Sequence, residues 1–155
     1  MTGRPDLDLT VARIIRAPRE ALWDAWTDPK KFEQWWLPKP MSLRVVEMDV
    51  RPGGGMVTEM SEDGQTFQPH LTACFLEVEP LKRIVWTTLM AGGWRPIEPF
   101  FQITAVISFN DHPDGVEYHS RVMHRNGTER QSHADMGFEA GWGTVADQLK
   151  ALVGG

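Results

Sequence analysis

The chain has 155 residues, 41% of them hydrophobic, and a formal net charge of -5. This length suits one globular domain, and the acidic balance excludes the basic surface typical of nucleic-acid binding. A single cysteine, Cys74, excludes an internal disulfide framework and favours a reducing compartment. The N-terminus MTGRPDLDL lacks the apolar segment of a signal peptide, and no run of 18 apolar residues predicts a membrane span. We therefore expect a cytoplasmic protein.

The first third of the chain predicts one strand and two short helices. Apolar and polar residues alternate over residues 7–16, which is typical of a half-buried strand. Pro18 opens an amphipathic stretch that ends at Trp26, because proline suits the first position of a helix. Asp28-Pro29 repeats the signal as an N-cap and first helical residue, and the prolines at 38 and 40 end the second helix.

That second short helix carries two adjacent tryptophans, Trp35 and Trp36. One indole ring can serve the core, whereas two from one short helix need a further role. The pair either packs on two sides, between the sheet and a later helix, or contributes to a pocket mouth or a dimer surface.

The middle of the chain reads as antiparallel sheet. Turn signals such as Asp63-Gly64 separate six further strand patterns, over residues 41–50, 56–60, 66–79, 83–90, 101–109 and 116–124. Because no crossover helices separate them, the strands are expected to be antiparallel. The Gly/Pro-rich loop at 91–99 holds two apolar residues, Trp94 and Ile97.

The C-terminal stretch 128–153 predicts one long helix, with Thr128 as its N-cap. Its apolar stripe is bulky toward the C-terminus and small or polar toward the N-terminus. This difference indicates either close backbone packing or room for a ligand beneath the helix. The small or polar positions are Gln131, Ala134, Asp135, Gly137 and Gly141.

Together these elements predict an α+β fold. A curved antiparallel sheet wraps around the long C-terminal helix, and two short helices follow the first strand. We expect residues 1–6 to be a flexible N-terminus and residues 7–153 to form a single domain.

Four segments carry a family resemblance: ARIIRAPREALWDAWTDPKKFEQWW, EMDVRPGGG, FLEVEPLKRIVWT and GFEAGWGTVADQLKALV. In this order they resemble the family named for the C-terminal domain of the activator of heat-shock-protein-90 ATPase. That family belongs to the START/Bet v-like helix-grip superfamily (SRPBCC), so the resemblance implies the helix-grip fold. Many members carry a histidine three residues before the Gly-Trp of the last helix, where this chain has Phe138. A role for that imidazole therefore does not transfer.

Catalytic and metal-binding motifs are missing from the sequence. Gly53-Gly54-Gly55 lacks the lysine of a phosphate loop, no serine lies in a G-x-S-x-G setting, and the five histidines match no zinc spacing. We expect no metal and no cofactor, and the sequence leaves open whether the protein is an enzyme.

The predicted function is binding of a small hydrophobic ligand in a cavity between the sheet and the C-terminal helix. The ligand-binding residues that we predict on inward positions are Trp36, Met48, Met60, His70, Cys74, Trp86, Phe101, Tyr118, Asp135, Phe138 and Trp142.

Two alternatives remain. A cyclase/aromatase-like or hydrolase-like enzyme on an apolar substrate would need a buried ionisable group, for which His70, His124 and Glu59 are the candidates. A chaperone-interacting stress-response module is implied by the family name. Besides the small apolar molecule, we expect a weak homodimer, through Trp35 and Trp36 or through the loop bearing Trp94 and Ile97, and no nucleic-acid partner.

Overall fold

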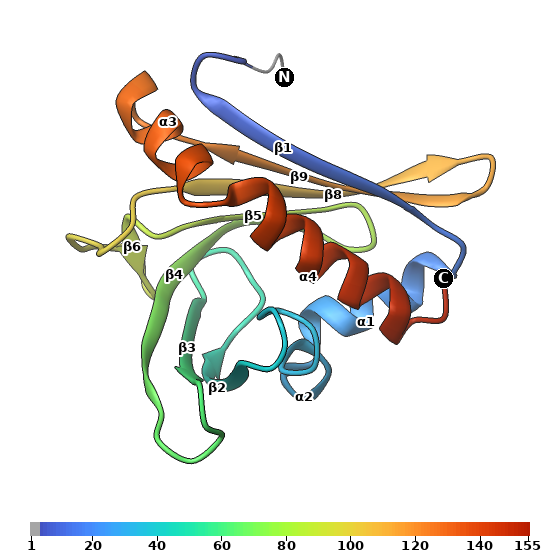
Figure 1. Cartoon of the computed structure of the whole chain (residues 1–155), viewed down its shortest axis with the longest axis horizontal. Helices are drawn as coiled ribbons and strands as arrows, with labels where there is room; N and C mark the ends of the chain where they lie inside the picture. The colour runs from blue at the N-terminus through green and yellow to red at the C-terminus, as the bar shows by residue number, and fades with distance from the viewer. Residues whose placement is uncertain (1–3) are drawn as a thin grey trace.

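The computed structural model describes residues 4–155 and confirms the α+β helix-grip fold. A seven-stranded antiparallel sheet has the order β1-β9-β8-β5-β4-β3-β2 (Figure 1). Its strands are β1 (Asp8–Ile15), β2 (Ser42–Met48), β3 (Gly55–Ser61), β4 (Gln68–Glu79), β5 (Arg83–Thr87), β8 (Thr104–His112) and β9 (Gly115–Met123). The helices are α1 (Arg19–Thr27), α2 (Pro29–Phe32), α3 (Gly127–Asp135) and α4 (Phe138–Leu152). A separate small hairpin, β6 (Met90–Ala91) and β7 (Arg95–Pro96), overlaps the predicted 91–99 loop.

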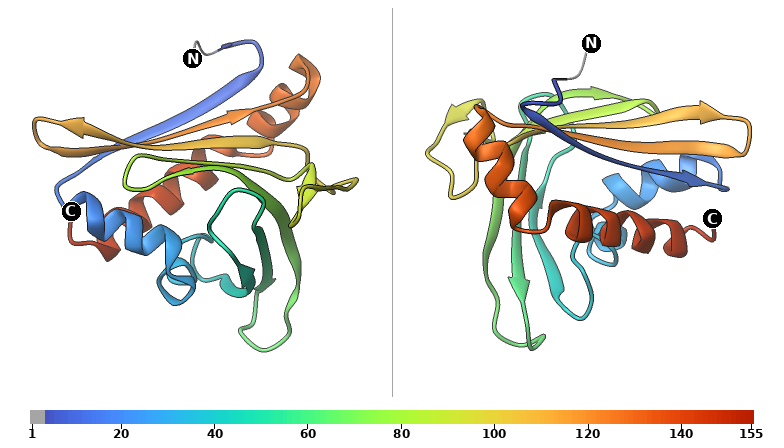
Figure 2. Two further views of the ribbon diagram at one scale, coloured as in Figure 1. Left: turned by 180° about the vertical axis from the view of Figure 1, so that it is seen from behind. Right: turned by 45° about the horizontal axis from the view of Figure 1, so that its top comes forward.

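The sheet is strongly curved. Figure 2 shows β2, β3 and β4 bending away from β1, β8 and β9. The pairing register shifts three times in the bent half, between Val45 and Glu47, between Thr58 and Glu59, and between Phe75 and Glu77. Such bulges add twist and bend a strand, so the sheet curls around α4 instead of lying flat beneath it.

The C-terminal helix is broken, which differs from the predicted single helix over 128–153. α3 ends at Asp135 and α4 begins at Phe138, because Gly137 adopts a left-handed φ of 95°. Only glycine takes that conformation at little cost. The N-cap also differs, since the side-chain oxygen of Asn126 accepts a hydrogen bond from the Glu129 backbone N–H at 2.9 Å. Thr128 lies inside the helix.

Both tryptophans of the 35–36 pair are buried, at 0% and 7% exposure. The Trp35 indole N–H donates to the Ala25 carbonyl at 2.8 Å, which fixes this ring in the core beneath α1. Trp36 faces the other way and contacts Trp86 and Trp142 edge-on. The pair therefore packs on two sides. It lies just after α2, which ends at Phe32 and so is shorter than the predicted helix.

The described N-terminal residues before β1 form a turn. Of the N-terminus predicted to be flexible, residues 1–3 lie outside the described residues, and the Arg4 carbonyl accepts hydrogen bonds from the N–H groups of Leu7 and Asp8 in a turn. Across residues 4–155, none of the helices has the length and apolar character to cross a membrane.

Candidate functional site: a pocket under the C-terminal helix

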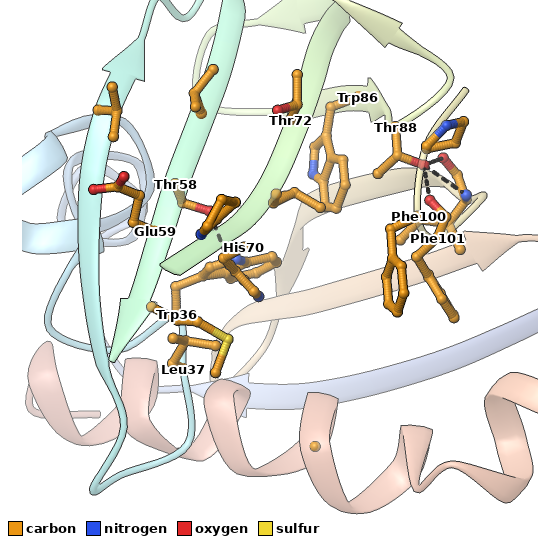
Figure 3. A pocket seen from close by; sticks show the side chains of 18 of the residues that line it. Trp36, Leu37, Thr58, Glu59, His70, Thr72, Trp86, Thr88, Phe100 and Phe101 are labelled. Carbon is orange, nitrogen blue, oxygen red and sulfur yellow. Dashed lines mark hydrogen bonds between the residues drawn. The ribbon is translucent and has the colours of Figure 1, made fainter. Parts of the chain in front are cut away.

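A pocket of about 900 Å³ lies between the curved sheet and α4. Figure 3 shows its side chains coming from several elements: Thr58 and Glu59 from β3, His70 and Thr72 from β4, Trp86 from β5, and Phe101 from the loop before β8. Trp36 and Leu37 enter from the segment after α2, and Gly141 and Trp142 belong to α4. The volume falls in the range of small-molecule pockets, about 300 to 1,000 Å³.

A continuous row of aromatic rings forms one wall of this pocket. Trp86 lies parallel to Trp142, with ring centroids 6.4 Å apart and planes at 10°. Trp142 stacks in turn on Phe138 at 5.4 Å, and Trp36 meets both tryptophans edge-on. Flat, rigid rings of this kind offer a large apolar contact area at little cost in side-chain entropy.

One polar atom in that wall is unpaired. The Trp86 side chain is 1% exposed, and its indole Nε1–H has no hydrogen-bond partner within residues 4–155. A buried donor is normally paired, so this unpaired N–H is an exception in the wall of the pocket.

The glycines of α4 could serve either close backbone packing or open space beneath the helix, and two of them differ in this respect. A Cβ added at Gly141, which lines the pocket, would find nothing within 4 Å among the described residues. A Cβ at Gly143 would lie 2.9 Å from Arg13 Nη2, on the side where Arg13 pairs with Asp147 at 2.7 Å. Gly143 thus serves close packing on β1, and Gly141 leaves space.

Gln148 of α4 fastens the segment that carries Trp36. Its side-chain amide donates to the carbonyls of Trp35 and Leu37 at 2.9 and 2.8 Å, and its oxygen accepts from the Lys39 N–H at 2.9 Å. Three bonds from one side chain hold the loop after α2 against the helix. The periodicity of α4 did not indicate this role, because only the folded chain brings the loop to Gln148.

Most polar side chains of the pocket are already engaged. His70 Nδ1 lies 2.9 Å from Thr58 Oγ1, and burial lowers the pKa of His70. Glu59 pairs with Arg44 at 2.6 Å. Thr88 Oγ1 donates to the Phe101 carbonyl and accepts from the Ile103 N–H. These bonds position the side chains. Thr72 and Glu98 also line the pocket, and their side chains make no hydrogen bond or ion pair with residues 4–155.

A pair of histidines lies at one end of the aromatic row. His124 Nε2 lies 2.9 Å from His133 Nδ1, and His124 Nδ1 lies 2.7 Å from the Leu7 carbonyl oxygen. Both rings are only 7% exposed, and His133 lines the pocket. Burial, and secondarily the charge of His124, lower the pKa of His133 to about 4. Sequence reasoning named His124 as a candidate but missed His133, because nine residues and a change from strand to helix separate the two.

The structure brings six of the predicted ligand-binding residues to the pocket: Trp36, Met60, His70, Trp86, Phe101 and Trp142. Phe138 lies behind Trp142 in the aromatic row. Met48 pairs with Met56 at the far edge of β2, and Asp135 is exposed, where it accepts from Gln131 at 2.8 Å.

Two more predicted residues belong to the core instead of the pocket lining. Tyr118 is 1% exposed, and its hydroxyl accepts from the Trp26 indole N–H at 3.0 Å. Cys74 is buried opposite Thr87, whereas its neighbour Phe75 lies opposite Trp86 on the face of the pocket. Successive residues of a strand point to opposite faces, so Cys74 points away from Trp86.

Ligand sets for a metal ion are missing from the described part of the chain. Within it, no three His, Cys, Asp or Glu side chains gather closely enough to hold one. The site as described is a largely apolar pocket walled by aromatic rings.

Comparison with known proteins identifies the family. The model of the family described as activator of Hsp90 ATPase homolog 1-like protein matches residues 16–154. The chain belongs to this family. None of the curated proteins matches the chain.

Solved structures of similar proteins share the fold over almost the whole chain. A crystal structure from Nitrosomonas europaea is 36% identical, with a TM-score of 0.87, and the match covers 97% of this chain and 96% of that one. A crystal structure from Chromobacterium violaceum is 22% identical, with a TM-score of 0.73 and coverage of 94% and 96%. The activator-of-Hsp90-ATPase-homolog-1-like protein from Aeromonas hydrophila is 20% identical, with a TM-score of 0.68 and coverage of 95% and 92%. The latter two likenesses concern the fold alone.

Proposed function

We propose that this family member binds a small, largely apolar molecule in the pocket between the sheet and α4. The observation that carries the proposal is a space of about 900 Å³ walled by Trp36, Trp86 and Trp142. Protein interiors normally close-pack, so a space of this size bordered by rigid aromatic rings is suited to a guest molecule. The proposed contacts are Trp36, Met60, His70, Trp86, Phe101 and Trp142.

The surroundings of the pocket support binding more than catalysis. The candidate ionisable groups His70 and Glu59 each have a partner at hydrogen-bond distance, and Glu59 is neutralised by Arg44. We place the protein in the cytoplasm, where the single buried thiol of Cys74 would stay reduced. We further propose weak self-association through exposed aromatic residues, which the Discussion develops.

Filling the space at Gly141 tests the proposal. We expect 2-methoxynaphthalene, a fluorescent apolar probe, to bind the native protein at one saturable site. Gly141→Leu places a side chain in the open space and should abolish binding, while circular dichroism and thermal unfolding show that the variant stays folded. Ala140→Leu is the matched control, because Ala140 is exposed on the same helix and the added bulk faces solvent.

Unchanged affinity in a folded Gly141→Leu variant would place the probe elsewhere and overturn the proposal. Unfolding of Gly141→Leu while Ala140→Leu stays folded would show that no room exists beneath α4. Gly141→Ala, which adds a single carbon, should retain folding and most of the binding.

A further inference from the structure

The hydrogen bonds of the His124–His133 pair point to the chemistry of the ligand, and this step rests on the proposed binding function. We infer that the pocket takes a planar apolar molecule bearing a hydroxyl group, as in a phenol, whose O–H donates to His133 Nε2.

The argument begins at a backbone carbonyl. The Leu7 oxygen can only accept, so the hydrogen bond of 2.7 Å from His124 requires a proton on His124 Nδ1. We take His124 in its neutral form, in which the other nitrogen, Nε2, is the acceptor of the 2.9 Å bond to His133. His133 Nδ1 must therefore carry the proton in that bond. A neutral His133 is left with an unprotonated Nε2.

That nitrogen has no hydrogen-bond partner among residues 4–155, although the His133 ring lines the pocket. Phe101 and Phe138 meet the ring nearly edge-to-face, with centroids at 4.6 and 5.0 Å, and they fix its orientation. An acceptor on a buried, immobilised ring costs stability unless a donor satisfies it. A ligand hydroxyl supplies that donor.

The charge state supports an acceptor and argues against a proton-abstracting base. Burial lowers the pKa of His133 to about 4, so the ring is neutral near pH 7 and its basicity is weak. The His133 ring contacts His124, Phe101 and Phe138, so no carboxylate within the described chain contacts it and would favour a charged imidazole. The ligand is therefore held by its hydroxyl.

The position of His133 also favours a flat ligand. The ring stands at the end of the row that runs through Phe138 and Trp142 to Trp86. An aromatic ring placed along that row brings its substituent toward His133.

A pair of probes that differ in one hydrogen-bond donor tests the inference. 2-Naphthol carries an O–H, and 2-methoxynaphthalene has the same ring system with a methyl ether that cannot donate. We expect the native protein to bind 2-naphthol about fivefold more tightly, the ratio that one net hydrogen bond gives. His133→Phe should remove this preference and leave the affinity for 2-methoxynaphthalene nearly unchanged. His119→Phe, on the opposite face of β9 from Tyr118 and Ser120, is the matched control and should keep it.

The outcomes separate this inference from the proposed function. Saturable binding of both probes with equal affinity would overturn the hydroxyl contact and leave the pocket in place. A preference for 2-naphthol that survives in His133→Phe would also overturn it. Absence of binding for both probes would overturn the proposed function and this inference together.

The tautomer itself can be measured in the native protein without any variant. Nitrogen-15 NMR of the imidazole rings should show His133 protonated at Nδ1 and unprotonated at Nε2; the opposite tautomer would overturn the inference. His124 is a positioning residue, since it acts only through His133. In His124→Phe, we expect the His133 nitrogen shifts to move toward a mixture of tautomers and the 2-naphthol preference to fall. An equal loss of affinity for both probes with unchanged His133 shifts would assign His124 a merely structural role.

Discussion

Tyr118 is the single tyrosine of the chain, and it lies at the centre of the core. Burial raises the pKa of its hydroxyl to about 12, against the smaller opposing effects of hydrogen bonds with Trp26 and Ser120. Removing the phenolic proton would place a charge among Trp26, Trp35 and Phe109, where solvation is poor. One side chain thus reports on the integrity of the whole core.

We therefore predict that the phenolate absorbance of the folded protein appears only near pH 12. The folded-state pKa exceeds the ordinary value of 10.0, so this contribution to stability is complete below pH 10 and is lost as the pH rises through about 12. The two-unit shift corresponds to about 2 to 3 kcal/mol. Ultraviolet titration in buffer and in denaturant gives the folded and unfolded pKa values. A folded-state midpoint near 10 would show that Tyr118 is accessible to solvent.

At this scale, the least predictable feature was the face of the sheet on which each side chain lies. Alternation in β4 grouped Cys74 with Leu76 and Val78, but the register shift between Phe75 and Glu77 interrupts the alternation. A bulge inserts one residue and exchanges the faces on either side, and its sequence carries no distinct signal here. Trp86 lies on the pocket face as predicted, in a strand that pairs with β8 without a shift.

At the scale of elements, α3 and α4 show what a periodic pattern can and cannot establish. The spacing of Phe138, Val145 and Leu149 predicts the helix correctly, and all three residues are buried. The sequence did not predict the break at Gly137, because the helical periodicity continues across it. Gly141 and Gly143 lie in the same segment and could equally have ended a helix. Only the backbone conformation distinguishes them, with a positive φ at Gly137 and a helical interior position at Gly141.

This difference predicts opposite effects for the same substitution. An added Cβ meets nothing within 4 Å in the described chain at either glycine, so the backbone conformation alone decides. Gly137→Ala should destabilise the protein by about 1 to 2 kcal/mol, because alanine is strained at positive φ. Gly141→Ala should stabilise it by about 0.5 to 1 kcal/mol, because alanine favours the helix. Denaturant unfolding of both variants measures the effects, and equal signs would contradict the break at Gly137.

At the scale of the whole molecule, the sequence predicted the layers but not the assembled site. Bunched strand patterns without crossover helices sufficed for an antiparallel sheet, and the resemblance supplied the helix-grip arrangement. The pocket combines β3, β4, β5, the segment after α2 and α4, and its lining depends on how far the bulged strands curve. The His124–His133 contact depends on α3 turning back over the end of β9. Neither is encoded in local spacing.

Exposed apolar side chains gather around the β6–β7 hairpin. The small β6–β7 hairpin projects from the molecule beside β4 (Figure 1), and the stretch around it exposes Leu89, Trp94 and Phe100, with Phe100 fully exposed. Large apolar side chains gathered on one exposed stretch favour association, and aromatic residues are enriched in interfaces. Trp35 and Trp36 are buried, so this stretch is where a homodimer would form.

We predict a weak homodimer that forms through this stretch at high protein concentration. Sedimentation velocity over a concentration series up to about 1 mM should show reversible association, since an interface this small gives a weak dissociation constant. Phe100→Ser should shift the species toward monomer, because it removes the most exposed apolar side chain. Met136→Ser is the matched control: Met136 is 66% exposed at the junction of α3 and α4, outside the 89–100 stretch, and its loss should leave association unchanged. A monomer throughout the series, or equal effects of the two variants, would contradict a dimer through the hairpin.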